Sequence, residues 1–98
     1  MNAVSLLATL VQRDPLRFTP AGVPILGFRV QHQSTQWEAR AERRVELEMA
    51  AVAMAEPALE LEHVDLGRSI SLNGFLAPRR RNSRGIVLHV TAFEFIEV

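Results

Sequence analysis

The sequence predicts a small all-β barrel. Apolar and polar residues alternate with a period of two along most of the chain, and turn signals separate the alternating stretches. One crossover segment lies between the third and the fourth stretch. The five expected strands are Ala3–Arg13, Val23–Gln33, Arg43–Val52, Arg68–Leu76 and Ile86–Val98.

The first half of the chain contains three of these strands. Asp14-Pro15 ends the first strand, and the turn Thr19-Pro20-Ala21-Gly22 leads into the second. Ser34–Glu42 is polar, which predicts a loop with Trp37 in its middle. The alanine content after this loop would also suit a helix, but strict alternation through Met49 favours a third strand.

The second half begins with the crossover Glu56–Leu66, which we expect to be a short helix or irregular, with Gly67 as its terminator. Gly74 suits a barrel corner, where a strand bends sharply. The alternation slips near Phe93-Glu94-Phe95-Ile96-Glu97, which predicts a bulge or twist in the last strand. The five-stranded Greek-key OB-fold has this order of elements, with its helix between strands three and four. An SH3-like barrel is the alternative, although its strands tend to be shorter.

Length and composition limit the possibilities further. The 98 residues suit one domain, 1–98, and a hydrophobic fraction of 48% is ample for its core. The absence of cysteine excludes disulfides and thiolate metal sites. The apolar N-terminal stretch lacks the basic region of a signal peptide, and no run reaches the roughly 18 apolar residues of a membrane span. We therefore expect a cytoplasmic protein with no membrane partner.

Positive charge is concentrated in the connection between the last two strands. The chain is formally neutral, yet four of its 11 basic residues lie in Ala77–Gly85. No acidic residue in this segment offsets them. A β-hairpin with such a tip predicts binding to phosphate or to an acidic surface. The four residues are Arg79, Arg80, Arg81 and Arg84.

Other residues are weaker candidates for contacts with nucleic acid. Trp37 has polar neighbours, which favours an exposed side chain that could stack on a base or pack at a subunit contact. Arg13, Arg17 and Arg44 could extend the basic track, although Glu46 and Glu48 could neutralise Arg44. The phenylalanines with strand spacing are expected in the core or an interface; these are Phe28, Phe75, Phe93 and Phe95.

The sequence gives no support for catalysis. His32, His63 and His89 are scattered without metal-ligand spacing, and His89 is expected at the surface or an interface. No phosphate-binding glycine loop, nucleophile elbow or paired-carboxylate motif occurs. We expect neither an enzyme nor a bound cofactor.

Several short motifs together resemble the primosomal replication protein N (PriB) family. The resemblance runs from about Val4 to Ile96. It depends on the order and spacing of Arg13-Asp14-Pro15-Leu16-Arg17, Gly22-Val23-Pro24, Phe28, His32 with Ser34, and Gly74-Phe75 with Val87-Leu88-His89.

This resemblance implies a homodimer of OB-folds, similar to single-stranded-DNA-binding proteins, that binds single-stranded DNA without sequence preference. It also implies partnership with the replication-restart helicase PriA and other primosome factors. The basic loop of the family corresponds to Arg79, Arg80, Arg81 and Arg84, where the family usually has lysines.

One position departs from the family pattern. Glu46 stands where family members commonly carry an aromatic residue, and a carboxylate on the binding face would repel phosphate. The alternative function is therefore a protein-interaction adaptor whose arginine loop docks on a helicase, with weak or no DNA binding. An oligomeric DNA-coating protein is a third possibility, which we expect less because the sequence ends at Val98 without a long acidic-tipped tail.

Overall fold

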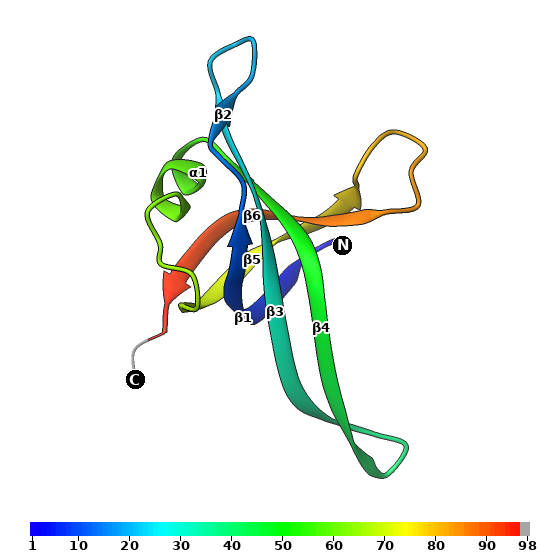
Figure 1. The fold of residues 1–98 in the computed structure, drawn as a ribbon. Coiled ribbons are helices and arrows are strands. Elements are labelled where there is room, and N and C mark those ends of the chain that lie inside the picture. The colour runs from blue at the N-terminus through cyan, green and yellow to red at the C-terminus, as the bar shows by residue number, and fades with distance from the viewer. Residues whose placement is uncertain (97–98) are drawn as a thin grey trace.

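The computed structural model describes residues 1–96, and over this range the chain forms six strands and one short helix (Figure 1). The first five elements are β1 (Val4–Arg13), β2 (Arg17–Phe18), β3 (Pro24–Glu38), β4 (Ala41–Met54) and α1 (Glu56–Leu61). The last two are β5 (Ser69–Pro78) and β6 (Ile86–Phe95). The last two residues of the strand expected to reach Val98 lie outside the described range.

The strands form one sheet that closes on itself. Their order is β1-β5-β6-β4-β3-β2, and an additional antiparallel pairing of β1 with β3 closes the barrel. Strands β4 and β6 pair in parallel, which requires a crossover connection, and α1 lies in that connection. This is the predicted OB-fold, and β2 is a short addition inside the first loop.

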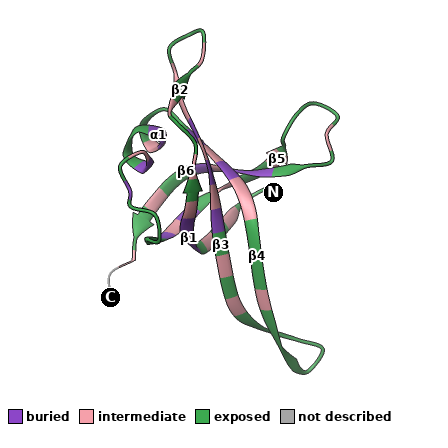
Figure 2. Cartoon of the chain, in the orientation of Figure 1, coloured by how far each residue is buried: buried purple, intermediate pink, exposed green. Residues whose placement is uncertain are grey.

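The core lies inside the barrel, where alternate strand residues point inward (Figure 2). Leu26, Phe28 and Val30 of β3 are at most 2% exposed, and Leu61 of α1 is fully buried against them. Helix α1 is short, and among residues 1–96 no helix is long and apolar enough to cross a membrane.

Gly74 sits where the backbones of β5 and β6 leave no room for a side chain. A Cβ atom at this position would lie 1.8 Å from the carbonyl oxygen of His89 on β6. The pairing shifts by one residue here, because Asn73 pairs with Ala92 whereas Gly74 pairs with Val90. Thr91 is therefore the extra residue of a β-bulge. The expected corner is confirmed at Gly74, and the slip in the last strand begins at Thr91, earlier than expected.

The prediction of a loop over Ser34–Glu42 was wrong. Strands β3 and β4 stay paired to Glu38 and Ala41, and only Ala39 and Arg40 form the turn. Both turn residues have positive φ (51° and 65°), the geometry of a tight hairpin turn. This end of the hairpin projects from the barrel with both faces in solvent, so it has no apolar alternation to reveal a strand (Figures 1 and 2).

Gly67 does not terminate the helix, which ends at Leu61. Its φ of 90° suits glycine. Its backbone N–H donates a hydrogen bond to the carbonyl oxygen of Leu10, and Leu10 N–H in turn bonds the carbonyl of Arg68. Gly67 therefore ties the end of the crossover to β1, just before β5 begins.

Candidate nucleic-acid interface

A groove opens on the outer face of the barrel beside the arginine loop. Its volume is about 500 Å³. Strands β3 and β4 contribute its floor, the loop after β1 lines one side, and the start of the arginine loop and β6 line the other. The lining residues are Gln12, Asp14, Arg17, Ile25, Gly27, Phe28, Arg29, Ala50, Ala51, Val52, Met54, Arg79, Val87 and His89.

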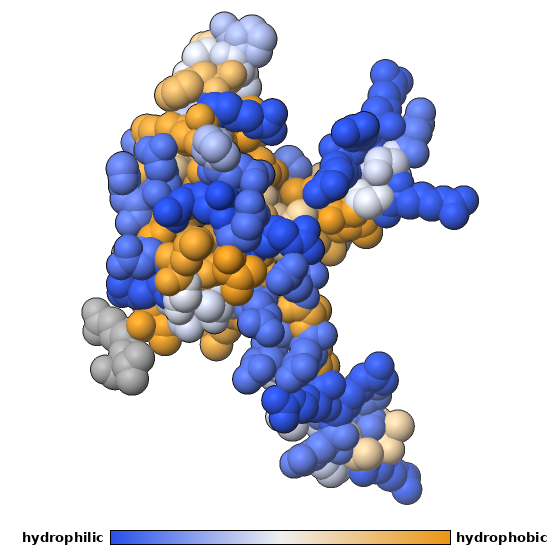
Figure 3. Space-filling model, in the orientation of Figure 1, coloured by the Kyte–Doolittle hydropathy of each residue, from blue (hydrophilic) through white to orange (hydrophobic). Residues whose placement is uncertain are grey.

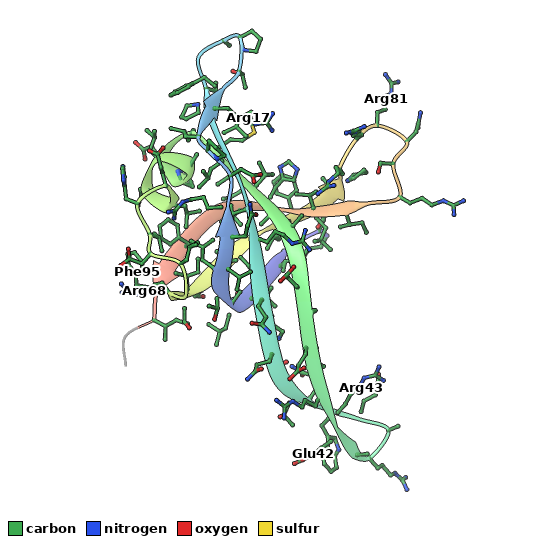
Figure 4. All side chains as sticks on the ribbon, in the orientation of Figure 1. Arg17, Glu42, Arg43, Arg68, Arg81 and Phe95 are labelled. Atoms are coloured by element: carbon green, nitrogen blue, oxygen red, sulfur yellow. The ribbon has the colours of Figure 1, made fainter. Side chains whose placement is uncertain are left out.

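The arginine loop, residues 79–85, is held at its base and exposed at its tip. Arg79 N–H donates to the carbonyl of Gly85 at 2.8 Å, and Ser83 N–H donates to the carbonyl of Arg80 at 2.9 Å. Asn82 has a positive φ of 64°, which asparagine tolerates in turns. These bonds fix the turn, while all four arginines of the loop are exposed. The loop projects from the barrel with a hydrophilic surface, and Arg81 points away from the barrel (Figures 3 and 4).

The loop carries unbalanced positive charge. Within residues 1–96, none of its four arginines is within ion-pair distance of a carboxylate. The arginines of the β3–β4 hairpin differ, because Arg44 pairs with Glu46 at 2.9 Å and Arg29 pairs with Glu48 at 2.8 Å. A formally neutral chain thus presents four arginines without a carboxylate partner in the described part of the chain, side by side at one end of the groove.

The structure brings some of the predicted residues together. Arg17 and Arg79 line opposite sides of the groove. Trp37 is 70% exposed near the tip of the β3–β4 hairpin, on the hairpin face that also carries Arg44 and Glu46. The same face continues into the floor of the groove, since the pairing of β3 with β4 has no interruption. Glu46 therefore lies on this outer face but beyond the groove itself.

Arg13 lies apart from the other predicted residues. Its neighbour Gln12 lines the groove. Because successive strand residues point to opposite sides, the side chain of Arg13 points away from the groove. Its Nη1 donates to the carbonyl oxygens of Leu61 (3.3 Å) and Val64 after α1. Arg13 therefore holds the crossover against β1, and a contact with nucleic acid stays a prediction.

Replacing Arg13 with methionine tests this structural role. The Arg13→Met change leaves two carbonyl groups at the end of α1 without their charged donor. We expect the free energy of unfolding to fall by about 1.5–3 kcal/mol, the usual size for a hydrogen bond to a charged group. Urea unfolding followed by circular dichroism measures it, with Arg40→Met at the exposed hairpin turn as the control. Equal stability of both variants would contradict this role.

Two groove residues, Arg29 and His89, were not predicted from the sequence, nor was the stacking of Phe75 on His89. Arg29 lines the groove at the centre of β3. His89 lines it from β6, and the ring of Phe75 stacks on His89 from the paired position on β5, with ring centroids 4.9 Å apart. Phe28 and Phe93 pack in or against the core as expected, whereas Phe75 and Phe95 are 38% and 46% exposed. The sequence signal that could have placed Phe75 on the outer face is its position on β5, an odd number of residues from the inward-facing Leu72.

Comparison with known proteins defines the class first. A family model described as "Another single-strand binding protein family" matches residues 2–92. The fold is also similar to that of the single-stranded DNA binding protein of Thermus aquaticus, with a TM-score of 0.77 and 24% identity over 99% of this chain and 50% of that one. The chain is thus an OB-fold of the single-strand binding protein type.

Two further comparisons identify the family. Replication restart protein PriB of Bordetella pertussis is 41% identical over 90 residues, covering 92% of this chain and 84% of the relative. A solved structure of PriB from Ralstonia solanacearum has a TM-score of 0.91 and 33% identity, and each chain covers 99% of the other. The chain belongs to the PriB family, which confirms the resemblance found in the sequence.

Proposed function

We propose that this protein binds single-stranded DNA without sequence preference, as an accessory protein of replication restart. The observation that carries the proposal is the groove with a loop of four arginines at its end, none of them neutralised within the described residues. In OB-folds this surface, between the first loop, strands two and three and the last loop, binds oligonucleotides. Membership of the PriB family supports the same function.

Each predicted residue except Arg13 has a part in this proposal. Arg79, Arg80, Arg81 and Arg84 capture the phosphate backbone, and Arg17 holds it on the opposite side of the groove. Phosphate contacts carry no sequence information, so the binding is sequence-independent. Trp37 offers an exposed ring to a base farther along the β3–β4 face. Arg44 adds positive charge on this face when its ion pair with Glu46 is broken.

The direct test is fluorescence anisotropy of labelled oligonucleotides titrated with the protein across a salt series. We expect binding of oligo-dT and of a mixed-sequence single strand with similar affinities. We also expect weaker binding of the corresponding duplex, because paired bases cannot stack on protein side chains. The affinity should fall steeply with salt, by about 0.7 log units per tenfold change for each phosphate neutralised. Negligible binding of single strands at low salt would overturn the proposal.

We propose a homodimer as the binding unit. Two arginine loops on one dimer would contact one strand, and the second contact gains from the high effective concentration that the first creates. Sedimentation equilibrium measures the mass of the particle directly. A monomer at the concentrations used for DNA binding would contradict this part of the proposal and leave single-strand binding standing.

The proposed partner is the PriA helicase, with other primosome factors. The printed name of the relatives, replication restart protein, supports this context. Unwinding of a forked DNA by PriA, measured with and without the protein, tests it. We expect faster unwinding with the protein present and no such effect when the arginine loop is replaced with alanine.

An adaptor without strong DNA binding is the second candidate function. It is favoured by the ion pairs Arg44–Glu46 and Arg29–Glu48, which leave the outer face of the hairpin close to neutral. In this case the arginine loop docks on an acidic surface of the helicase. Binding to PriA that persists when single-stranded DNA does not bind would support the adaptor.

Replacing Glu46 with glutamine measures how far this carboxylate limits DNA binding. Glu46→Gln removes the negative charge that pairs with Arg44 and frees one guanidinium. We expect the affinity for oligo-dT to rise up to about fivefold at roughly 0.1 M salt, and the salt slope to steepen by about 0.7. Glu60→Gln on α1 makes the same charge change away from this face and should alter neither value.

A further inference from the structure

Two aromatic rings stand stacked at the wall of the groove. Phe75 on β5 and His89 on β6 occupy directly paired positions, with ring planes only 12° apart. His89 lines the groove, and Phe75 does not. The rings therefore form a layered pair in which His89 faces the groove and Phe75 supports it from behind.

The His89 ring has no polar partner to explain its orientation. Among the described residues, neither of its ring nitrogens makes a hydrogen bond or an ion pair within the protein. By contrast, the His32 ring is bonded at both nitrogens, to the carbonyl of Leu7 and to Ser34 Oγ. The neighbours of His89 in the groove wall are the apolar Val52 and Val87. Its ring is thus held by packing against Phe75 and is open toward the groove.

The backbone holds this ring in a fixed position. The carbonyl oxygen of His89 lies against Gly74, so close that no larger residue fits there. The bulge at Thr91 follows two residues later. Glycine at this point thus lets β5 and β6 approach closely, which keeps the paired positions of Phe75 and His89 side by side. A platform fixed in this way loses little entropy when a flat ligand binds.

The charges around the ring favour an anionic ligand with flat groups. Arg17 and Arg79 line the groove with His89 and have no carboxylate partner among the described residues, whereas Arg29 is paired with Glu48. Asp14 is the carboxylate among the lining residues. The Asp14 carboxylate is already engaged by the side-chain amide of Gln12 at 2.8 Å. A nucleic-acid strand with its phosphates on Arg17 and Arg79 would pass its bases along the apolar floor beside His89.

We propose that the His89 ring, backed by Phe75, is a base-stacking platform of this groove. This inference rests on the proposed single-strand binding and specifies where a base is held. Every nucleobase has a flat π-face, so the platform accepts any base and adds affinity without adding sequence preference. It also supplies stacking inside the groove, at a position distinct from Glu46 and from the hairpin tip with Trp37.

The test compares two labelled oligomers of equal length, oligo-dT and an abasic oligomer with the same phosphates. The wild-type protein should bind oligo-dT more tightly. His89→Leu should lower the affinity for oligo-dT about fivefold or more, the lower end of one lost stacking contact, and leave the affinity for the abasic oligomer unchanged. His89→Phe keeps a flat ring and should retain the preference for bases. Phe75→Leu removes the support and should lower the preference in part.

The matched control is Phe95→Leu, because Phe95 is a similarly exposed aromatic residue that packs with Arg68 at the other end of the barrel (Figure 4). Thermal melts establish that each variant is folded. An unchanged preference for oligo-dT in both His89→Leu and Phe75→Leu would overturn the platform. So would equal wild-type affinity for the two oligomers, with single-strand binding still standing. Failure of the wild type to bind either oligomer would overturn the proposed function as well.

Discussion

Replacing Arg79, Arg80, Arg81 and Arg84 with alanine should reduce the affinity for oligo-dT about 10²- to 10³-fold at roughly 0.1 M salt. These side chains carry positive charge that no carboxylate within the described residues neutralises. Each phosphate they neutralise releases counterions from the strand. That release favours binding at low salt and vanishes near about 1 M salt, so the loss should depend strongly on salt concentration.

The salt dependence separates this cause from a general loss of structure. Four phosphate contacts on a single strand contribute roughly −3 to the slope of log affinity against log salt. The alanine variant should lose that contribution, and its affinity should converge with that of the wild type at high salt. A misfolded variant would instead lose affinity at all salt concentrations. Anisotropy titrations at several salt concentrations measure both quantities.

The matched control replaces the same four arginines with lysine. This variant keeps the charge and loses the planar, bidentate guanidinium groups. If the loop acts through charge, the lysine variant keeps the salt slope of the wild type. An alanine variant that binds as steeply as the wild type would show that the loop does not contact the strand. The adaptor function would then be the one to pursue, with the helicase as the ligand.

The barrel itself could be predicted because its strands have one buried face. Residues such as Leu26, Phe28 and Val30 are buried and alternate with less buried neighbours, and a period of two is visible in a single sequence. The helix between the third and fourth long strands then narrowed the topology to the OB-fold. The arginine loop could be predicted for a similarly local reason, since its four charges are close together in the sequence.

The outer half of the β3–β4 hairpin could not be predicted, because it buries no face. From Ser34 to Arg44 both sides of the ribbon meet solvent, so its sequence is polar like that of a loop. Its turn residues Ala39 and Arg40 also lack the glycine or asparagine that usually marks positive φ. What holds the strands together there is the backbone pairing and ion pairs such as Arg43–Glu38 at 3.0 Å.

The arrangement of the groove could not be predicted from the sequence, for a different reason. The stacking of Phe75 on His89 and the pairing of Arg44 with Glu46 depend on strand register and on the direction of each side chain. Alternation indicates that Phe75 and His89 each face outward from their own strand. Which residue of β6 lies opposite Phe75 depends on the bulge at Thr91, which shifts the pairing of β5 with β6 by one residue. A shift of one residue changes every cross-strand neighbour. Local sequence patterns carry no information on that register.

Gly74→Ala should destabilise the fold by about 3 kcal/mol or more, at the upper end of overpacking effects. The added Cβ would lie 1.8 Å from the carbonyl oxygen of His89 and 3.1 Å from the Cα of Val90. These are backbone atoms of β6, so a side-chain rotation cannot relieve the clash. Gly74 has no left-handed φ, and the cost is therefore steric. The strands would have to separate beside the bulge, next to the stacked rings of Phe75 and His89.

Thermal unfolding followed by circular dichroism measures the effect. A loss of about 3 kcal/mol in a domain of this size lowers Tm by roughly 12–24 °C. Gly85→Ala is the matched control, since its Cβ would meet only Ser83 Oγ at 3.4 Å and Arg79 Cβ at 3.7 Å. We expect that change to stay within about 0.5 kcal/mol. Similar Tm values for the two variants would mean that β5 and β6 do not approach as closely as this register requires, and the position of the His89 ring at the groove would lose its structural basis.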